Sequence, residues 1–202
     1  MGGEHPMWDQ RYGEPGYAYG TDPNSFLAVY ADQIPSGRVL CLAEGQGRNA
    51  VYLAQLGYRV TAVDSSVVGL AKARELAAQR GVRIDTVVAD LASFDIETEA
   101  WEGIVSIFCH LSPSVRGRLH RQIANGLSSG GCLILEAYTP RQQVFRSGGP
   151  PETELTMTVE CLREELVGVR LDMLREVERE VIEGKYHTGR GAVVQVLGRR
   201  GD

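Results

Sequence analysis

Two glycines and one aspartate are the residues whose types and spacing point most directly to a ligand. Gly45 and Gly47 interrupt an apolar run, and Asp64 follows 17 positions after Gly47. Glycines let a backbone approach a ligand closely, and a helix that starts after such a turn presents unpaired N–H groups. An acid at the tip of the next strand can accept two hydrogen bonds from ribose hydroxyls. This pattern predicts a nucleoside-binding half-fold.

The surrounding pattern supplies elements that would position these residues. A short apolar run predicts a strand over residues 38–43, helical spacing of apolar residues predicts a helix over 48–56, and a second strand follows over 59–63. Strands and helices then alternate as far as residue 137, which favours a right-handed, doubly wound parallel sheet. The further elements expected there are helix 67–80, strand 84–89, strand 104–109, helix 113–127 and strand 132–137.

The pattern changes after residue 138. Residues 139–154 have no apolar rhythm and predict a mobile loop, and residues 159–166 predict a short helix. Residues 175–183 and 192–199 alternate as strands do, which predicts a hairpin with the loop 184–191. The sheet therefore should end with antiparallel pairing.

The first 23 residues contain four aromatic side chains and one arginine in an irregular, glycine-rich context: Trp8, Arg11, Tyr12, Tyr17 and Tyr19. Residues 1–23 are either a loosely packed tail or a lid over a cofactor. The number of aromatic residues favours the lid, because disordered ends rarely carry so many.

Length and composition set limits on the function. With 202 residues, 43% of them hydrophobic, we expect one domain over residues 1–202. The net charge of -5 argues against a nucleic-acid surface, and no apolar run approaches the roughly 20 residues of a membrane span. The N-terminus lacks the features of a secretory signal, and the four widely spaced cysteines are typical of buried thiols in a reducing cytoplasm.

The nucleoside-binding pattern is open to more than one class of function. Residues 45–50 satisfy the G-x-G-x-x-A pattern of an NAD-binding oxidoreductase, and Asp64 lies near the expected distance. The predicted hairpin leaves no room for a second mononucleotide half, which argues against this class. A regulatory protein that binds a nucleoside without catalysis is the other alternative.

Four motifs together carry a more specific resemblance. They are Leu42-Ala43-Glu44-Gly45-Gln46-Gly47-Arg48-Asn49, Val63-Asp64, Val88-Ala89-Asp90-Leu91 and Leu127-Ser128-Ser129-Gly130-Gly131-Cys132-Leu133. The chain resembles the class I S-adenosylmethionine-dependent methyltransferases, in particular the tellurite-resistance and thiopurine methyltransferase-like group. Trp8-Asp9-x-Arg11-Tyr12 and Tyr19-Gly20 also fit that group. The resemblance implies a Rossmann-like α/β fold with seven strands, mostly parallel, with an antiparallel last strand.

The resemblance also implies a cofactor site for S-adenosyl-L-methionine. The Gly45–Gly47 turn would lie against the methionine part, Asp64 would hold the ribose, and Asp90 with Leu91 would hold the adenine. Residues 107–109 would form the floor near the sulfonium. The full set is Trp8, Arg11, Tyr19, Ala43, Glu44, Gly45, Gly47, Asn49, Asp64, Ser65, Asp90, Leu91, Ile107, Phe108 and Cys109. A simpler interpretation makes Asp64 a helix cap and Asp90 a turn residue.

One position departs from the family pattern. Members usually carry an acid two positions before the first motif glycine, where this chain has Ala43, and Cys41 stands close by. Glu44 supplies a carboxylate nearby, which would contact the cofactor's ammonium group or a loop N–H. The alternative is a solvated loop carboxylate.

Three residues are candidates for catalysis. His110 follows the fourth predicted strand, where family members place substrate-facing residues, and His187 lies in the predicted hairpin loop. The tellurite-resistance enzymes carry a His-Arg pair in a comparable place, but Thr188 follows His187, so Arg190 is the candidate stand-in. Each histidine is equally consistent with a purely structural or exposed residue. We expect a cytoplasmic monomer or homodimer that methylates a small molecule, such as a thiol or a metalloid oxyanion, without a metal, a membrane or a nucleic acid.

Overall fold

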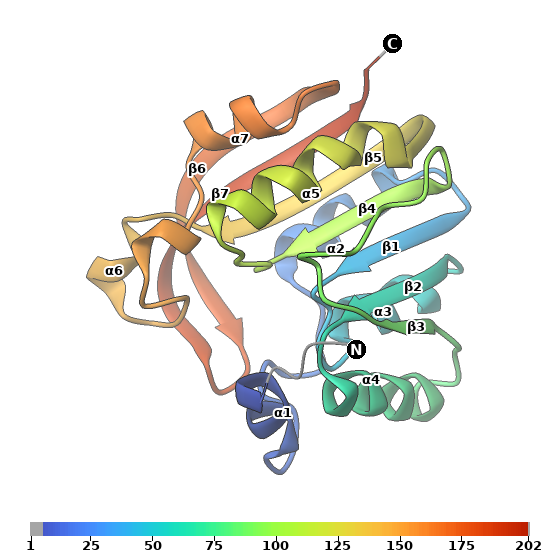
Figure 1. Cartoon of the computed structure of the whole chain (residues 1–202). Coiled ribbons are helices and arrows are strands. Elements are labelled where there is room, and N and C mark those ends of the chain that lie inside the picture. Colours follow the sequence, from blue (N-terminus) through green and yellow to red (C-terminus); the bar gives the residue numbers. More distant parts are fainter. Residues whose placement is uncertain (1–5, 202) are drawn as a thin grey trace.

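Seven strands form one mixed sheet in the order β3-β2-β1-β4-β5-β7-β6 (Figure 1). The computed structural model describes residues 6–201. The strands are β1 (Arg38–Leu42), β2 (Arg59–Asp64), β3 (Asp85–Val88), β4 (Trp101–Ile107), β5 (Leu127–Tyr138), β6 (Val169–Glu183) and β7 (His187–Arg200). β7 pairs antiparallel with both β5 and β6, and the remaining pairs are parallel. The predicted fold class is confirmed.

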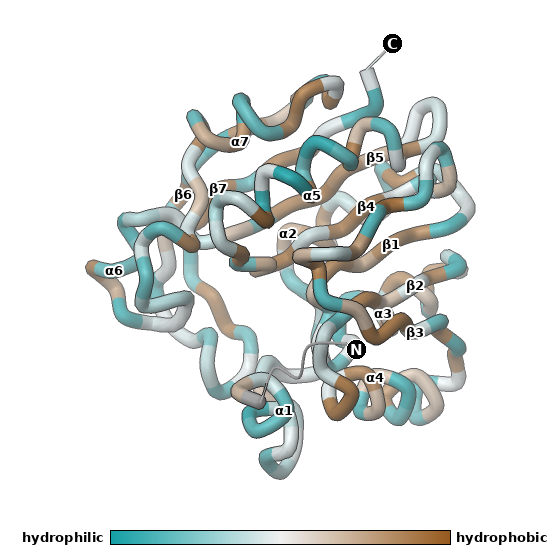
Figure 2. The backbone as a smooth tube through the Cα atoms, viewed as in Figure 1, coloured by the Kyte–Doolittle hydropathy of each residue, from teal (hydrophilic) through white to brown (hydrophobic). Residues whose placement is uncertain are grey.

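Helices cover both faces of this sheet. They are α1 (Pro6–Gly13), α2 (Ser25–Tyr30), α3 (Arg48–Gln55), α4 (Val67–Gln79), α5 (Pro113–Gly126), α6 (Gln142–Phe145) and α7 (Val159–Glu165), with short 3₁₀ turns at Ala31–Gln33 and Thr153–Leu155. Leu40 and Leu42 of β1 pack in the core on the α5 and α7 side, whereas Val39 and Cys41 pack in the core on the α2 and α3 side. Alternate residues of a strand point to opposite faces, so a central strand must be apolar throughout. Figure 2 shows this as largely hydrophobic colours along the central strands.

The carboxyl edge of the sheet holds unusual backbone where β1 and β4 end. Ala43 and Phe108, which directly follow these neighbouring strands, have φ angles of 51° and 52°. Non-glycine residues rarely adopt this left-handed conformation, and such strain concentrates at functional sites. The strand order reverses between β1 and β4, which is where open α/β sheets bind ligands. We therefore expect a ligand-binding site at this edge of the sheet.

Several predicted boundaries were wrong. β7 begins at His187, so the hairpin connection is only residues 184–186 and not 184–191. β5 begins at Leu127 and absorbs the turn expected at 129–131, with an irregularity in its pairing near Trp101. Within the expected loop 139–154 lies α6, whose Gln142 is buried and accepts a hydrogen bond from the Ala192 N–H. The mobility of that segment stays a prediction.

The segment from α1 to residue 23 lies between α4 and the tip of the β6–β7 hairpin (Figure 1). Asp9 accepts a hydrogen bond from the Ser66 hydroxyl at the start of α4. Glu14 accepts from Lys185 and from the Tyr186 hydroxyl of the hairpin tip. The segment therefore packs on the body rather than trailing from it, and residues 1–5 of the predicted lid lie outside the described residues. Every described helix is too short or too polar to span a bilayer.

Candidate functional site

The glycine turn between β1 and α3 is shaped by a carboxylate. Gly45 and Gly47 have φ angles of 60° and 89°, and a Cβ at Gly47 would lie 2.6 Å from the Cβ of Ala73. Oε1 of Glu44 accepts hydrogen bonds from the N–H groups of Asn49 and Ala50, at 2.9 and 2.8 Å. Glu44 thus takes the role of a loop N–H acceptor and is not a solvated carboxylate, since it is only 9% exposed. Its side chain occupies the N-terminus of α3.

Burial governs the ionisation of Glu44. Loss of solvent raises the pKa of this carboxyl to about 7, although the Ala50 N–H, Arg48 and the Asn49 N–H all act to lower it. Nearby Asp64 raises it further. The same burial, together with Glu44, raises the pKa of the Cys41 thiol. The turn therefore carries a carboxyl group that gains and loses a proton near neutral pH.

Asp64 joins the glycine turn to the second strand. Its Oδ2 accepts from the Gly45 N–H and its Oδ1 from the Ser66 N–H, both at 2.8 Å. Ser66, and not Asp64, caps α4 with its hydroxyl. Asp64 is thus held at the end of β2, in the place where the resemblance expects a ribose contact. Ser65 follows it, half-buried.

The end of β3 lies beside Asp64, since the Ala89 N–H donates to the Asp64 carbonyl. Asp90 closes a local turn there, with its Oδ1 accepting from the Ala92 N–H. Leu91 is buried in the core. Asp90 is therefore a turn residue in the place where the resemblance expects an adenine contact.

An aromatic side chain that sequence reasoning did not select covers the glycine turn. A Cβ at Gly45 would lie 2.5 Å from the hydroxyl of Tyr12, and one at Gly69 would lie 2.8 Å from its ring. Burial and then Asp64 raise the pKa of Tyr12. Tyr12 is the last residue of the motif that begins at Trp8, and this was the sequence signal by which it could have been selected. Trp8 stacks on it, with ring centroids 5.6 Å apart.

The predicted lid residues Arg11 and Tyr19, and also Asn49, make contacts between segments of the protein. Arg11 donates to the Tyr19 hydroxyl at 3.0 Å and lies over the rings of Trp8 and Tyr186. The side chain of Asn49 accepts from the Asn24 N–H at 2.9 Å, so it faces α2 rather than the turn.

The predicted floor at the end of β4 consists of two buried side chains and one strained aromatic residue. Ile107 and Cys109 are 7% and 3% exposed, and burial raises the pKa of the Cys109 thiol to about 12. The Phe108 ring stacks on Tyr138 of β5 at 4.5 Å and meets His187 of β7 edge-on at 4.8 Å. At the left-handed residue Phe108 the ring thus faces β5 and, beyond it in the sheet, β7.

The two candidate histidines converge here, but Arg190 does not. His110 uses both ring nitrogens: Nδ1 contacts the Leu155 carbonyl at 3.1 Å, and Nε2 accepts from the Tyr138 N–H at 3.4 Å. His187 is buried within strand β7, not exposed in a loop. Arg190 is three residues further along the strand, on the opposite face, and pairs with Glu178. It cannot replace the missing arginine of a His-Arg pair.

A buried ionic network lies behind His187 and was missed at the sequence level. Glu183, which pairs in register with His187, binds Arg48 and Arg179, and Arg179 also binds Glu136 of β5. Asn24 donates to both glutamates. The sequence signal for this network was Glu136, the single acid in the apolar run Cys132 to Ala137, because a buried carboxylate requires partners.

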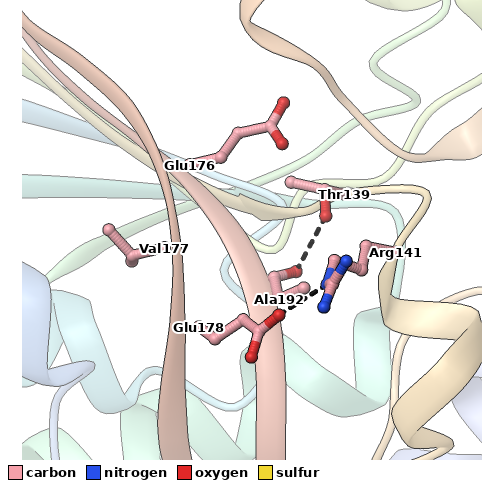
Figure 3. Close-up of a pocket in the computed structure, with 6 residues that line it drawn as sticks. All are labelled: Thr139, Arg141, Glu176, Val177, Glu178 and Ala192. Atoms are coloured by element: carbon pink, nitrogen blue, oxygen red, sulfur yellow. Dashed lines mark hydrogen bonds and ion pairs between the residues drawn. The ribbon is translucent and has the colours of Figure 1, made fainter.

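A pocket of about 160 Å³ lies outside this arrangement (Figure 3). It is lined by Thr139, Arg141, Glu176, Val177, Glu178 and Ala192. Arg141 contacts Glu178 at 2.5 Å within it. None of the residues selected from the sequence lines this pocket.

Comparison with known proteins supports the fold described above. Residues 39–131 match the family model of a methyltransferase domain. No curated protein sequence gives a significant match. A protein of echinomycin biosynthesis that converts a disulfide bond into a thioacetal group superposes with a TM-score of 0.75 and 20% identity, over 96% of this chain and 91% of its own. The chain has the class I methyltransferase fold.

Two further structures show the same fold. TehB from Haemophilus influenzae matches with a TM-score of 0.72 and 21% identity, over 96% of this chain and 65% of its own. An S-adenosylmethionine-dependent methyltransferase from Methanosarcina mazei matches with a TM-score of 0.66 and 17% identity, over 89% of this chain and 99% of its own. At these identities the likeness concerns the methyltransferase fold, and the acceptor must be argued from the residues.

Proposed function

We propose that this protein is an S-adenosylmethionine-dependent methyltransferase acting on a small-molecule acceptor such as a thiol or a metalloid oxyanion. The observation that carries the proposal is the Glu44 carboxylate on the N-terminus of α3, where it accepts the Asn49 and Ala50 N–H groups. In NAD-binding proteins the cofactor's pyrophosphate occupies that position. A buried carboxylate there would repel a phosphate, whereas it would attract a cationic cofactor.

The remaining contacts fit such a cofactor. Asp64 would accept from the ribose hydroxyls, and the Gly45–Gly47 turn, where added Cβ atoms would clash, would lie along the methionine part. Ile107, Phe108 and Cys109 would form the floor. S-adenosylmethionine supplies an electrophilic methyl group on a sulfonium, so the protein needs to orient the two reactants and exclude water.

The proposal extends to the subgroup, the cellular location and the adenine contacts. The likeness to TehB supports the tellurite-resistance-like group, but Arg190, the expected partner of His187 in a His-Arg pair, pairs with Glu178 instead. Four cysteines without disulfide bonds support a reducing, cytoplasmic location. We keep Asp90 and Leu91 as the proposed adenine contacts because of their place at the end of β3.

Ligand binding tests the proposal directly. In isothermal titration S-adenosylhomocysteine should bind the protein, and in thermal shift it should raise the melting temperature. NAD should do neither. Stabilisation by NAD alone would overturn the assignment. Transfer of a labelled methyl group to a panel of thiols, metalloid oxyanions, amines and phenols would then separate an enzyme from a nucleoside-binding regulator.

A further inference from the structure

Four aromatic side chains meet beside the end of β4 and are called the ring cluster here: Tyr19, Phe108, Tyr138 and His187. Centroid distances to His187 are 4.5 Å from Tyr19, 4.8 Å from Phe108 and 5.2 Å from Tyr138. They come from the N-terminal segment and from the ends of β4, β5 and β7 nearest the glycine turn. The ring cluster therefore adjoins the proposed sulfonium site.

The ring cluster contains two buried polar atoms that lack a hydrogen-bond partner among the described residues. They are the hydroxyl of Tyr138, a residue with no exposed surface, and Nδ1 of His187, which is 9% exposed. Leaving such atoms unpaired costs free energy, so each requires an explanation. The bare backbone of the loop before α7 closes over them: a Cβ at Gly148 would lie 2.8 Å from the His187 ring, and one at Gly149 would lie 2.8 Å from the Tyr138 ring.

Both groups remain uncharged at neutral pH. Burial, followed by Arg48, His110, Arg11 and Arg179, lowers the pKa of His187 to about 3. Burial, followed by Glu183, raises the pKa of Tyr138, against Arg179 and Arg48.

The charged groups behind the ring cluster cannot serve as a base. The carboxylates of Glu136 and Glu183 accept from Asn24 and are paired with Arg48 and Arg179. The nitrogens of His110 are both engaged, and burial lowers its pKa to about 4. These two glutamates and His110 thus leave donors and positive charge around the cluster, and Glu44, whose pKa is about 7, holds the Asn49 and Ala50 N–H groups instead.

We propose that the Tyr138 hydroxyl and the Nδ1–H of His187 bind the nucleophilic atom of the acceptor, and that this atom arrives as an anion, a thiolate or a comparably soft anion. The inference rests on the proposed methyltransferase function and deepens it. The acceptor loses its proton to solvent before binding. Its lone pair then forms the bond to the methyl carbon, while the electron pair of the breaking carbon–sulfur bond stays on the cofactor's sulfur.

Charge neutralisation explains why neutral donors suffice. A cationic sulfonium and an anionic acceptor give two neutral products, so a site shielded from water favours the transition state over the separated ions. A neutral amine would instead leave a new cation beside Arg48 and Arg179. Sulfur also makes favourable contacts with aromatic rings.

The test uses 4-nitrothiophenolate, whose visible absorption reports the thiolate directly, and the Tyr138→Phe variant. Titrated into the complex with S-adenosylhomocysteine, the thiolate should bind the wild-type protein and bind the variant about tenfold to a hundredfold more weakly, as loss of a hydrogen bond to a charged group predicts. Tyr30→Phe on α2 is the matched control and should bind as the wild type does. Uncharged 4-nitroaniline should bind more weakly than the thiolate.

The possible outcomes distinguish a failure of the proposed methyltransferase function from a failure of the inference about the acceptor. No binding of S-adenosylhomocysteine would overturn the proposed function itself. Binding of S-adenosylhomocysteine by folded Tyr138→Phe, with an unchanged thiolate affinity, would overturn the present inference alone. Equal affinity of the wild-type complex for the thiolate and the aniline, or no affinity for the thiolate, would also overturn it.

Discussion

Replacing Glu44 by glutamine should remove a large pH dependence from the stability of this protein. Both backbone donors, Asn49 and Ala50, bind the same oxygen of Glu44, so the glutamine carbonyl can keep both hydrogen bonds. What the substitution removes is the ionisation. The variant therefore isolates the charge of the carboxyl from its role in shaping the turn.

The magnitude follows from the raised pKa. Folding shifts this carboxyl from 4.5 to about 7, and one pKa unit corresponds to about 1.4 kcal/mol, which gives about 3 kcal/mol. Because the folded pKa is the higher one, the contribution is fully present below about pH 4.5 and is lost as pH rises through about 7. Glu44→Gln should lack this loss. The difference in unfolding free energy between wild type and variant should thus change by about 3 kcal/mol between pH 4.5 and 8.

Urea unfolding at a series of pH values measures this difference. Glu160→Gln is a suitable control, because Glu160 is also a glutamate in the first turn of a helix but is exposed on α7. The control should follow the wild-type curve. A difference between wild type and Glu44→Gln that stays constant with pH would refute the reasoning. If a cationic cofactor binds beside Glu44, titration near pH 7 in buffers of different ionisation enthalpy should also show release of about half a proton.

Three other substitutions have expected outcomes. Asp64→Asn should weaken S-adenosylhomocysteine binding at least about tenfold in calorimetry, because an amide nitrogen would face one of the two N–H donors now held by the carboxylate. Glu165→Gln should destabilise the fold by about 1 to 2 kcal/mol at pH 7, a value reduced for solvent screening: burial raises the pKa of Glu165, but hydrogen bonds from His120 and Arg116 outweigh it and lower the pKa to about 2. Wild-type stability should be lost as the pH falls from 4.5 towards 2, and an unchanged urea midpoint in the variant would contradict this. Gly149→Ala should lower the thermal midpoint, because its φ is 89° and the new Cβ would lie 2.8 Å from the Tyr138 ring; an unaltered midpoint would show that the loop has room.

Features that depend on neighbouring residues were predictable from the sequence. The turn of Gly45 and Gly47, the strand before it and the cap of α4 within the pair Ser65-Ser66 all follow from local chemistry. The alternation after residue 138 correctly indicated antiparallel pairing. The boundaries of the hairpin did not follow, because residues 187–191 continue the ladder with Glu183 and its neighbours although two glycines interrupt their pattern.

Contacts between distant segments were not predictable. Tyr138 meets His187 only because β5 and β7 pair, and nothing within either strand marks the meeting. Tyr12 reaches Gly45 only because α1 docks on α4. In both cases an aromatic side chain becomes part of the candidate site through tertiary packing, which the local pattern does not encode.

The same packing joins the two halves of the candidate site. Arg48 directly follows the glycine turn in the chain, yet its guanidinium pairs with Glu183, which lies opposite His187 in the hairpin. Asn24 bridges Glu183 and Glu136, and its backbone N–H donates to Asn49 of the same helix α3. A shift of the turn on cofactor binding would leave buried charges unpaired unless the hairpin moved with it, and unpaired buried charges are costly. The cofactor turn and the ring cluster should therefore respond to ligands as one unit.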